Sequence, residues 1–330
     1  MDLLSDVIAA MRMGQPHYAR SERHAPWAVR HQPFTGAGFH LVLEGRSWLI
    51  PPDGEPIELQ AGDVAFIPHG SAHSVAGDPA TLVADLPSSP LADPHQDDHP
   101  DGAGAGPRTV MLCGAYLMDR ARPHPLLREI PEFVHLPARL GQHSSLRGAT
   151  ELLATELAEP RLGSDALLPA LLDTLLLYVM RAWLDERPGH NATTGWSAAL
   201  HDPAIHAALQ GIHGAPHRPW TVEELGALAG LSRAAFARRF TTLVGQPPLT
   251  YLTWWRMTTA ARLLRDSDAP LKSVANRIGY TSEFAFSTAF KREHGLTPSA
   301  YRRQTTSADL DTTDADRRVT RSGERMRSQH

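Results

Sequence analysis

The sequence predicts a two-domain protein of the α+β class, with an N-terminal part built on a small all-β barrel or sandwich with helices and an all-α C-terminal part. Between Tyr18 and Leu86, short segments rich in Val, Ile, Leu, Phe and Trp alternate with Gly and Pro turns, as in small β-domains. Between residues 220 and 303, a helix-turn-helix pattern occurs twice. The net charge changes sign between the two parts, which indicates that they bind different partners.

The charge asymmetry is large. Residues 1–200 hold 14 Lys and Arg against 24 Asp and Glu, a net charge of −10, whereas residues 201–304 hold 13 against 7, a net charge of +6. Residues 305–330 hold five of each, so the whole chain carries −4. A phosphate-binding surface needs excess positive charge, and the basic part coincides with the repeated helical pattern. The acidic part is not expected to contact DNA.

Composition limits the class of protein further. The 330 residues are enough for two domains with hydrophobic cores. A single cysteine, Cys113, excludes a disulfide within the chain and is typical of a reducing compartment. The first residues lack the basic segment and cleavage site of a signal peptide. The longest apolar run, residues 167–180, contains an Asp and is shorter than the roughly 18 residues of a membrane span. We therefore expect a cytoplasmic protein without a membrane partner.

The N-terminal part begins with a predicted amphipathic helix over residues 2–13, followed by the β-segments. Residues 85–108 are polar and rich in Pro, Gly and Asp, so we expect a flexible surface loop there. A strand is predicted at residues 109–118, and helices are predicted at Ser144–Glu159 and Ser164–Asp185.

The helix over residues 164–185 carries leucines on more than one face. One face would pack on the β-structure, and the surplus could pair with the same helix of a second subunit, giving a homodimer. The alternative is a monomer helix that is buried on all sides. The predicted N-terminal domain spans residues 1–187, and a linker is predicted over residues 188–201.

Two β-segments carry candidate chemistry: Phe39–Gly45, which reads FHLVLEG, and Gly62–His73, which reads GDVAFIPHGSAH. They resemble the two halves of the cupin signature, in which a strand with His and Glu faces a strand that ends in Pro-x-Gly-x-x-His. The matching residues are His40, Glu44, Pro68, Gly70 and His73. The resemblance implies a cupin-like β-barrel.

The same residues suggest a metal site. His40 and Glu44 are four residues apart, so both point to the same face of a strand. If that face is the barrel interior, His40, Glu44 and His73 can converge on Zn²⁺ or another divalent metal ion. Val42 occupies the place of the second His of a full cupin site. The alternative is a hydrogen-bonded barrel histidine at position 40 and a turn residue at position 44.

Cys113 is the candidate redox residue. It alternates with hydrophobic residues in the predicted strand 109–118, which favours a buried core thiol. The alternative is a reactive thiol that lines a sensor pocket, where oxidation of one thiol or an intersubunit bond would act as the switch. His95 and His99 lie among acidic residues of the polar loop, and we expect solvated side chains there.

The repeated pattern of the C-terminal part has nearly the same spacing in both copies. A glycine, Gly230 or Gly279, ends a first helix, and a serine, Ser232 or Ser282, lies at the N-cap of a second helix. Each second helix carries two phenylalanines four residues apart, which form an apolar stripe. These residues are Phe236 and Phe240 in the first copy, and Phe286 and Phe290 in the second. The alternative for either copy is an ordinary helical hairpin with solvated charges.

The second helix of each copy is the expected DNA-reading helix. The segment between these two reading helices, Pro248–Ser267, has helical periodicity. About twenty helical residues span roughly 30 Å at a rise of 1.5 Å per residue. One turn of B-DNA spans roughly 34 Å. A rigid helix of this length could hold two reading helices in successive major grooves on one face of DNA.

Residues 202–304 resemble the DNA-binding domain of AraC/XylS-family transcription regulators. The residues that carry the resemblance are Ile278-Gly279-Tyr280, Ser282, Phe286, Phe290-Lys291-Arg292, Gly295, Pro298 and Tyr301-Arg302. Regulators of this family often have a cupin-type sensor domain in front of the DNA-binding domain, which agrees with the N-terminal pattern. The resemblance also implies dimerisation through helices of the N-terminal domain.

The resemblance assigns DNA contacts residue by residue. In the first copy, the predicted contact residues are Ser232, Arg233, Ala234, Ala237, Arg238 and Arg239. Arg238 is the predicted base reader, because arginine binds guanine O6 and N7 with two hydrogen bonds. In the second copy they are Ser282, Glu283, Ser287, Thr288, Lys291 and Arg292, and Phe284 is a further matching position. Many relatives carry Arg where this chain has Thr288, so we expect the second copy to anchor and orient more than it specifies.

Together these features predict a sequence-specific transcription regulator, an activator that contacts RNA polymerase or a repressor. A small molecule, metal or oxidant sensed in the cupin-like domain would control it. No catalytic constellation is recognised, so no enzyme activity is expected. One alternative is a metal-dependent cupin enzyme with an accessory DNA-binding domain, and another is a DNA binder without sequence preference. The tail, residues 305–330, is predicted to be disordered.

Overall fold

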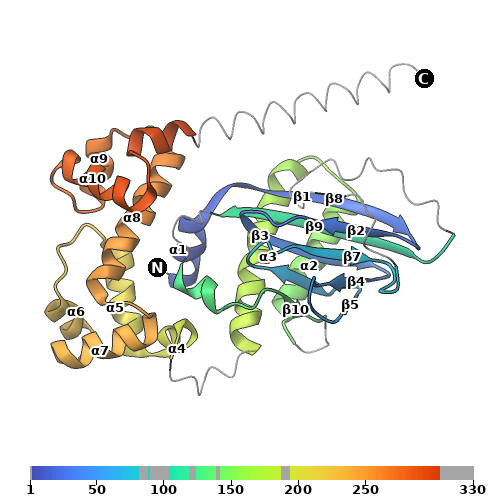
Figure 1. Cartoon of the computed structure of the whole chain (residues 1–330), viewed down its shortest axis with the longest axis horizontal. Helices are drawn as coiled ribbons and strands as arrows, with labels where there is room; N and C mark the ends of the chain where they lie inside the picture. Colours follow the sequence, from blue (N-terminus) through green and yellow to red (C-terminus); the bar gives the residue numbers. More distant parts are fainter. Residues whose placement is uncertain are drawn as a thin grey trace. The chain divides into compact units, whose positions relative to one another are not determined.

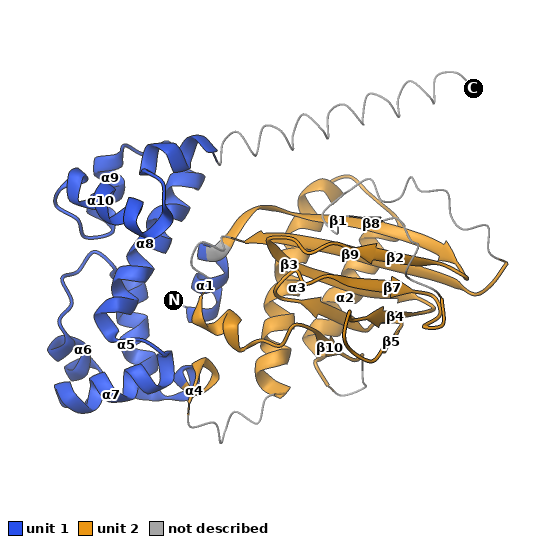
Figure 2. Cartoon of the chain, viewed as in Figure 1, with its two compact units in different colours: residues 1–11, 199–330 blue, residues 12–198 orange. Residues whose placement is uncertain are grey.

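A computed structural model describes residues 2–81, 88–89, 105–118, 124–138, 142–186 and 194–304. The chain forms two compact units, Met1–Met11 with Ala199–His330 and Arg12–Ala198 (Figure 2). The tail predicted to be disordered, most of the loop predicted over residues 85–108, and the first part of the predicted linker lie outside the described residues.

The unit Arg12–Ala198 is built on two five-stranded sheets (Figure 1). The first sheet has the order β1 (Arg12–His24), β9 (Arg108–Met118), β3 (Gly36–Glu44), β6 (Val64–Ile67) and β10 (Val134–Leu136). The second has the order β5 (Ile57–Gln60), β4 (Arg46–Ile50), β7 (His73–Ala76), β2 (Ala28–His31) and β8 (Ser88–Ser89). Neighbouring strands run antiparallel except β2 and β8, which run parallel. The predicted β-domain is confirmed.

Side chains from both sheets share one apolar core. Its buried members are Trp27, Val42, Leu49, Leu59, Ala65, Val75, Met111 and Cys113. Alternate residues of each strand point to this core, which follows from the two-residue period of a β-strand. Burial of this shared face is the main favourable term that holds the sheets together. Any polar side chain that points inward from these strands is enclosed by apolar groups.

Two helices belong to the same unit, α2 (Ser144–Ala158) and α3 (Ser164–Glu186), and they pack on each other. Helix α3 also contacts β1 and β10. It is the one described helix that is long and apolar enough to cross a membrane, but half of its most apolar window is buried inside the protein. Leu168, Leu172, Leu175 and Leu176 are among its buried residues, so α3 packs as a core helix.

The C-terminal unit is helical and contains the two predicted helix-turn-helix units. Its helices are α5 (Pro203–Gly214), α6 (Val222–Leu228), α7 (Arg233–Val244), α8 (Pro248–Asp266), α9 (Leu271–Arg277) and α10 (Glu283–His294). The turn glycines Gly230 and Gly279 have φ angles of 67° and 86°, a left-handed backbone that favours glycine. The hydroxyls of Ser232 and Ser282 accept hydrogen bonds from backbone amides in the first turns of α7 and α10.

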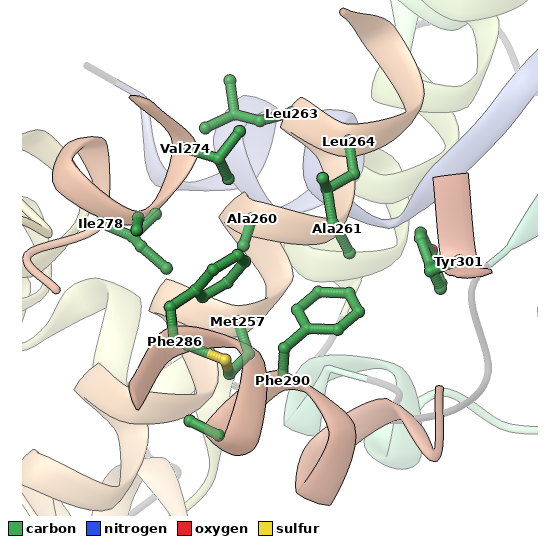
Figure 3. Packing of buried hydrophobic residues seen from close by; sticks show 12 residues of the cluster. Met257, Ala260, Ala261, Leu263, Leu264, Val274, Ile278, Phe286, Phe290 and Tyr301 are labelled. Carbon is green, nitrogen blue, oxygen red and sulfur yellow. The ribbon is translucent and has the colours of Figure 1, made fainter. Parts of the chain in front are cut away.

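The phenylalanine stripes lie where the spacing predicts. Phe236 and Phe240 of α7 are fully buried, as are Phe286 and Phe290 of α10. In the second copy, α8, α9 and α10 enclose a common core that includes Met257, Phe286 and Phe290 (Figure 3). The 19 residues of α8 span about 28 Å at 1.5 Å per residue, and they connect the two reading helices.

Helix α1 (Leu3–Met11) lies in the C-terminal unit, although we expected it in the N-terminal domain. Its buried face, which includes Leu3 and Val7, packs against α5 and α8. On this face, the Asp6 carboxylate lies 3.5 Å from His213 Nδ1. The spacing of apolar residues predicted an amphipathic helix, but it could not identify the surface that the apolar stripe covers.

The predicted linker, residues 188–201, is structured in its second half. Residues 196–201 form the short helix α4 (Trp196–His201), and the side chain of Trp196 is buried. The Trp196 ring packs edge-on against His124 at 4.2 Å between centroids, and the backbone amide of Trp196 donates to Glu129 Oε1 at 2.6 Å. The polar residues before Trp196 predict a linker, but the large apolar ring of Trp196 is buried where it packs against His124.

Candidate functional site

The first reading helix, α7, presents three arginines with different partners. Arg233 pairs with Glu223 at 2.8 Å. Arg239 pairs with Asp202, the residue that caps the first turn of α5. Arg238 is exposed, and no acidic group among the described residues forms an ion pair with it. Of the three guanidinium groups, that of Arg238 is therefore the one available to an incoming ligand.

The remaining predicted contacts of α7 lie on the same helix surface. Ala234 is exposed and Ala237 is partly exposed, whereas Phe236 and Phe240 point into the core. Ser232 is exposed but is occupied as the helix cap, where its hydroxyl lies 3.4 Å from the Ala235 amide. Among the predicted contacts on α7, Arg238 is thus the arginine without an ion pair, and it lies beside the two small residues Ala234 and Ala237.

The second reading helix, α10, has a more neutral surface. Glu283, Thr288 and Lys291 are exposed, and Ser287 is partly exposed. Arg292 is exposed and lies 3.2 Å from Glu293. The remaining predicted contact, Ser282, caps the helix.

Phe284 of α10 is a further position that matches the family's base-contacting positions, beside Glu283, Ser287 and Thr288. Its side chain is 83% exposed in the first turn of α10. Phe284 lies off the buried stripe that Phe286 and Phe290 define, which leaves its ring on the exposed side of α10.

The N-terminal unit encloses a cluster of three histidines, His31 of β2, His40 of β3 and His73 of β7. All three are buried, with exposed fractions of 2%, 0% and 3%. One ring nitrogen of each lies within 4.8 Å of the others. Residues from both sheets therefore bring three imidazoles together in one buried cluster.

Hydrogen bonds orient two of these rings. His73 Nδ1 donates to the Ser71 carbonyl at 2.8 Å, and so the lone pair of the His73 ring lies on Nε2. That nitrogen faces His40 Nε2 at 2.7 Å. His40 Nδ1 lies 2.9 Å from the sulfur of Cys113. The chain Cys113–His40–His73–Ser71 can be satisfied throughout with neutral imidazoles.

Burial also affects the protonation of these rings. It lowers the pKa of His73 to about 4, and the hydrogen bond that His73 donates to the Ser71 carbonyl only partly offsets this. The pKa of His40 is lowered well below its ordinary value, first by burial and then by the neighbouring His73 and His31. Both rings are therefore neutral near pH 7, which is the form that binds a metal ion.

Glu44 is not part of this cluster, and the expectation that it joins His40 and His73 is corrected. The register of β3 against β9 shifts between Val42 and Glu44, so the four-residue spacing does not keep both side chains on one face. The Glu44 carboxylate is 58% exposed and pairs with Arg108. His31 takes the third position instead, since it lies directly opposite His73 in the pairing of β2 with β7.

Cys113 is buried in the core between the sheets, as the alternation of its strand predicts. The sequence did not predict the partner of this thiol, which is the ring of His40 in the histidine cluster. The register of β3 and β9 causes this, since His40 lies directly opposite Cys113. His95 and His99 lie outside the described residues.

Comparison with known proteins agrees with both units. A cupin family model matches residues 2–185, and a helix-turn-helix domain model matches residues 225–304. A Streptomyces lividans protein described as an AraC-like transcription regulator is 34% identical over 307 residues, which cover 93% of this chain and 99% of that protein. The chain belongs to the AraC family of transcription regulators.

Further relatives of this AraC-family regulator are similar along their whole length. The regulator AlkR of Acinetobacter baylyi is 29% identical over 311 residues, which cover 92% of this chain and 100% of AlkR. The crystal structure of the AdpA DNA-binding domain with target DNA is 36% identical, with a TM-score of 0.31, and it aligns with 32% of this chain and 96% of that one. The curated relatives are transcription regulators, so this AraC-family protein is a DNA-binding regulator and not the cupin enzyme of the alternative reading.

Proposed function

We propose that this AraC-family regulator reads its operator with α7 and α10 in successive major grooves, and that α7 supplies most of the base recognition. The observation that carries the proposal is the state of Arg238. It is exposed on the polar face of α7, while Arg233 and Arg239 are each held by an acidic residue. A guanidinium without a competing partner can bind a guanine without first breaking an ion pair.

The proposed role of α10 is to position the protein on DNA. Lys291 and Arg292 are exposed basic residues, which suit phosphate contacts that carry no sequence information. Ser287 and Thr288 are short and neutral, so they form weaker base contacts than an arginine would. Specificity would then differ between the two half-sites.

Control by an effector is proposed for the N-terminal unit. The cupin match and the enclosed polar cluster between the sheets support a site for a small molecule, a metal or an oxidant. Such a ligand controls DNA binding only if it binds the DNA-competent and incompetent states with different affinity.

A homodimer formed through helices of the N-terminal unit is also proposed. Leu167 of α3 and Leu152 of α2 are 49% and 59% exposed, although four of the eight leucines of α3 are buried. A dimer would cover such apolar side chains. Sedimentation velocity of the Leu167→Glu variant tests this. The expected result is a shift from dimer to monomer, and an unchanged sedimentation coefficient would be the contrary one.

The proposal also includes a cytoplasmic location. If the protein is an activator, it includes contact with RNA polymerase.

The experiment that tests specific recognition is a competition on immobilised DNA. The full-length protein is first given a random DNA pool, and the selected sequence then competes against scrambled DNA of the same length and composition. We expect a selected motif with two half-sites about one helical turn apart and preferential binding to it. Selection without a motif, or equal competition by scrambled DNA, would show a DNA binder without sequence preference.

A further inference from the structure

We propose that Arg256 of α8 is a positioning residue for DNA recognition, which fixes the orientation of the second helix-turn-helix copy (α9 and α10) relative to the first (α6 and α7). Arg256 lies outside both reading helices and outside the predicted DNA contacts. By fixing this orientation, it selects the spacing between operator half-sites that the protein binds. The proposal rests on the proposed function, because it requires α7 and α10 to occupy two half-sites.

Helix α8 is shared by the cores of both copies. It packs against α5 and α7, and towards its other end against α9 and α10 (Figure 1). Tyr251, in the first turn of α8, packs against Phe240 of the first copy at 5.9 Å between ring centroids. Met257 and Leu264, further along α8, belong to the core of the second copy. The helix sets the distance between the copies, and a contact away from its axis is needed to fix their rotation about that axis.

The loop between α5 and α6, residues 215–220, provides such a contact. The Arg256 side chain donates from Nε to the Pro216 carbonyl at 2.7 Å and from Nη2 to the Arg218 carbonyl at 2.8 Å. Hydrogen bonds from a charged donor are stronger than those between neutral groups. A planar guanidinium also holds its two acceptors in a fixed geometry, so it defines an orientation as well as a distance.

The second copy meets the same loop through its turn. A Cβ placed on Gly279, the turn glycine between α9 and α10, would lie 2.6 Å from the His217 carbonyl oxygen and 3.0 Å from Arg256 Nη2. The backbone of this turn therefore lies directly against the loop and against the guanidinium. Arg256 is thus located where the loop that precedes the first copy meets the turn of the second.

The loop has a fixed place on the first copy. The Trp220 indole donates to the Ala215 carbonyl at 3.0 Å, which closes the loop. The Arg218 guanidinium lies 4.1 Å from the centroid of the Trp220 ring and 3.0 Å from Glu224 Oε1. Glu224 also completes the capping box that begins α6. Because α6 packs on α7, the carbonyls that Arg256 binds are held in a defined position relative to the first reading helix.

The consequence for recognition is a preferred half-site spacing. One added base pair moves a half-site by about 3.4 Å along the DNA and rotates it by about 35° around the DNA axis. Two reading helices in a fixed orientation cannot follow this change. Two copies joined flexibly can follow it, but the second copy then has a lower effective concentration at its half-site. Arg256 therefore determines spacing specificity without contacting a base.

The test compares three kinds of duplex by fluorescence anisotropy of the full-length protein. These are the selected operator, the operator with one or two base pairs inserted between its half-sites, and a duplex with one half-site only. The wild type should bind the lengthened operators much more weakly than the unaltered one. Arg256→Ala should bind the unaltered operator about 10-fold more weakly than the wild type. It should bind the lengthened operators as well as the unaltered one, and the single half-site like the wild type.

Arg262→Ala is the matched control, because it removes the same charge from the same helix. Within the described part of the chain, no hydrogen bond joins Arg262 to the loop 215–220. This variant should keep the wild-type preference for the unaltered spacing. Arg256→Lys keeps the charge but lacks the planar pair of donors, so its spacing preference should be reduced.

A measurement without DNA keeps the proposal testable if Arg256→Ala does not fold. Spin labels are attached at two exposed positions, through Thr242→Cys in α7 and Ser273→Cys in α9. The native Cys113 is buried, and the protein without these substitutions serves as the labelling control. Double electron–electron resonance should give one narrow distance when Arg256 is present and a broader distribution in Arg256→Lys. A broad distribution with Arg256 in place would overturn the proposal.

The remaining outcomes are also decisive. Equal spacing preference in the wild type and in Arg256→Ala would refute the positioning role, as would a wild type that binds all spacings equally well. An equal loss on the single half-site would show that Arg256 only supports the fold of α8. Loss of the wild-type preference for the operator over scrambled DNA would count against the proposed function instead. The spin-label distances would then still decide whether Arg256 fixes the orientation of the two copies.

Discussion

Replacement of Arg238 by alanine should separate specific from non-specific DNA binding. A bidentate arginine–guanine contact contributes about 1–3 kcal/mol of discrimination, which corresponds to about 5- to 150-fold in operator affinity. The unbound protein should be little affected, because Arg238 is exposed and forms no ion pair among the described residues. The loss should therefore come almost entirely from the bound state.

The assay is fluorescence anisotropy with the selected operator and a scrambled duplex, at several salt concentrations. Arg238→Lys keeps the charge but lacks the planar pair of donors, so it should lose operator preference while non-specific binding stays near the wild-type value. Arg233→Ala removes the same charge from a residue already paired with Glu223, so it should reduce binding to both duplexes by similar factors. Lys291→Ala should do the same and lower the salt slope by about 1.

Equal losses on operator and scrambled DNA for Arg238→Ala would refute the assignment of Arg238 as a base reader. Retention of full operator preference by Arg238→Lys would also contradict it, since the charge alone would then be sufficient.

Three further predictions concern the C-terminal unit. In urea unfolding, Gly279→Ala should destabilise it more than Gly230→Ala. Both glycines have positive φ, which costs about 1–2 kcal/mol for alanine. Only at position 279 would a Cβ lie 2.6 Å from the His217 carbonyl oxygen, and this contact should add about 1–3 kcal/mol. Leu3→Ala should lower the hydrogen-exchange protection of α8 by about 2 kcal/mol, since Leu3 is 2% exposed on the helix that packs there. Phe284, which is 83% exposed, should contact a thymine methyl, so uracil at one operator position should weaken wild-type binding by about 0.8 kcal/mol but leave Phe284→Ala unchanged.

Each of these predictions has a contrary outcome. Equal stability losses for the two glycine variants would show that the backbone relaxes around position 279. Unchanged exchange in α8 after Leu3→Ala would mean that α1 does not stabilise the C-terminal unit. Uracil scanning that affects the wild type and Phe284→Ala alike, or neither, would exclude a methyl contact by Phe284.

The sequence by itself determined the local structure of each helix-turn-helix unit. Gly230, Ser232, Phe236 and Phe240 act within one helix and its preceding turn, so their spacing defines the cap, the turn and the buried face. The same holds for the second copy. Such contacts are local in sequence, and the period of 3.6 residues is enough to place them. The assignment of Arg238 as the base reader came from the resemblance to AraC-family regulators together with the chemistry of arginine, and it stays a prediction.

Only the tertiary structure decided which residues meet across strands and helices. His31 joins His40 and His73 because β2 lies beside β7, and Glu44 leaves the cluster because the register of β3 shifts before it. Cys113 reaches His40 through the pairing of β9 with β3, and α1 finds its partner in α8 rather than in the sheets. The period of one segment fixes which side of it is apolar, but register and docking depend on a partner that is distant in sequence.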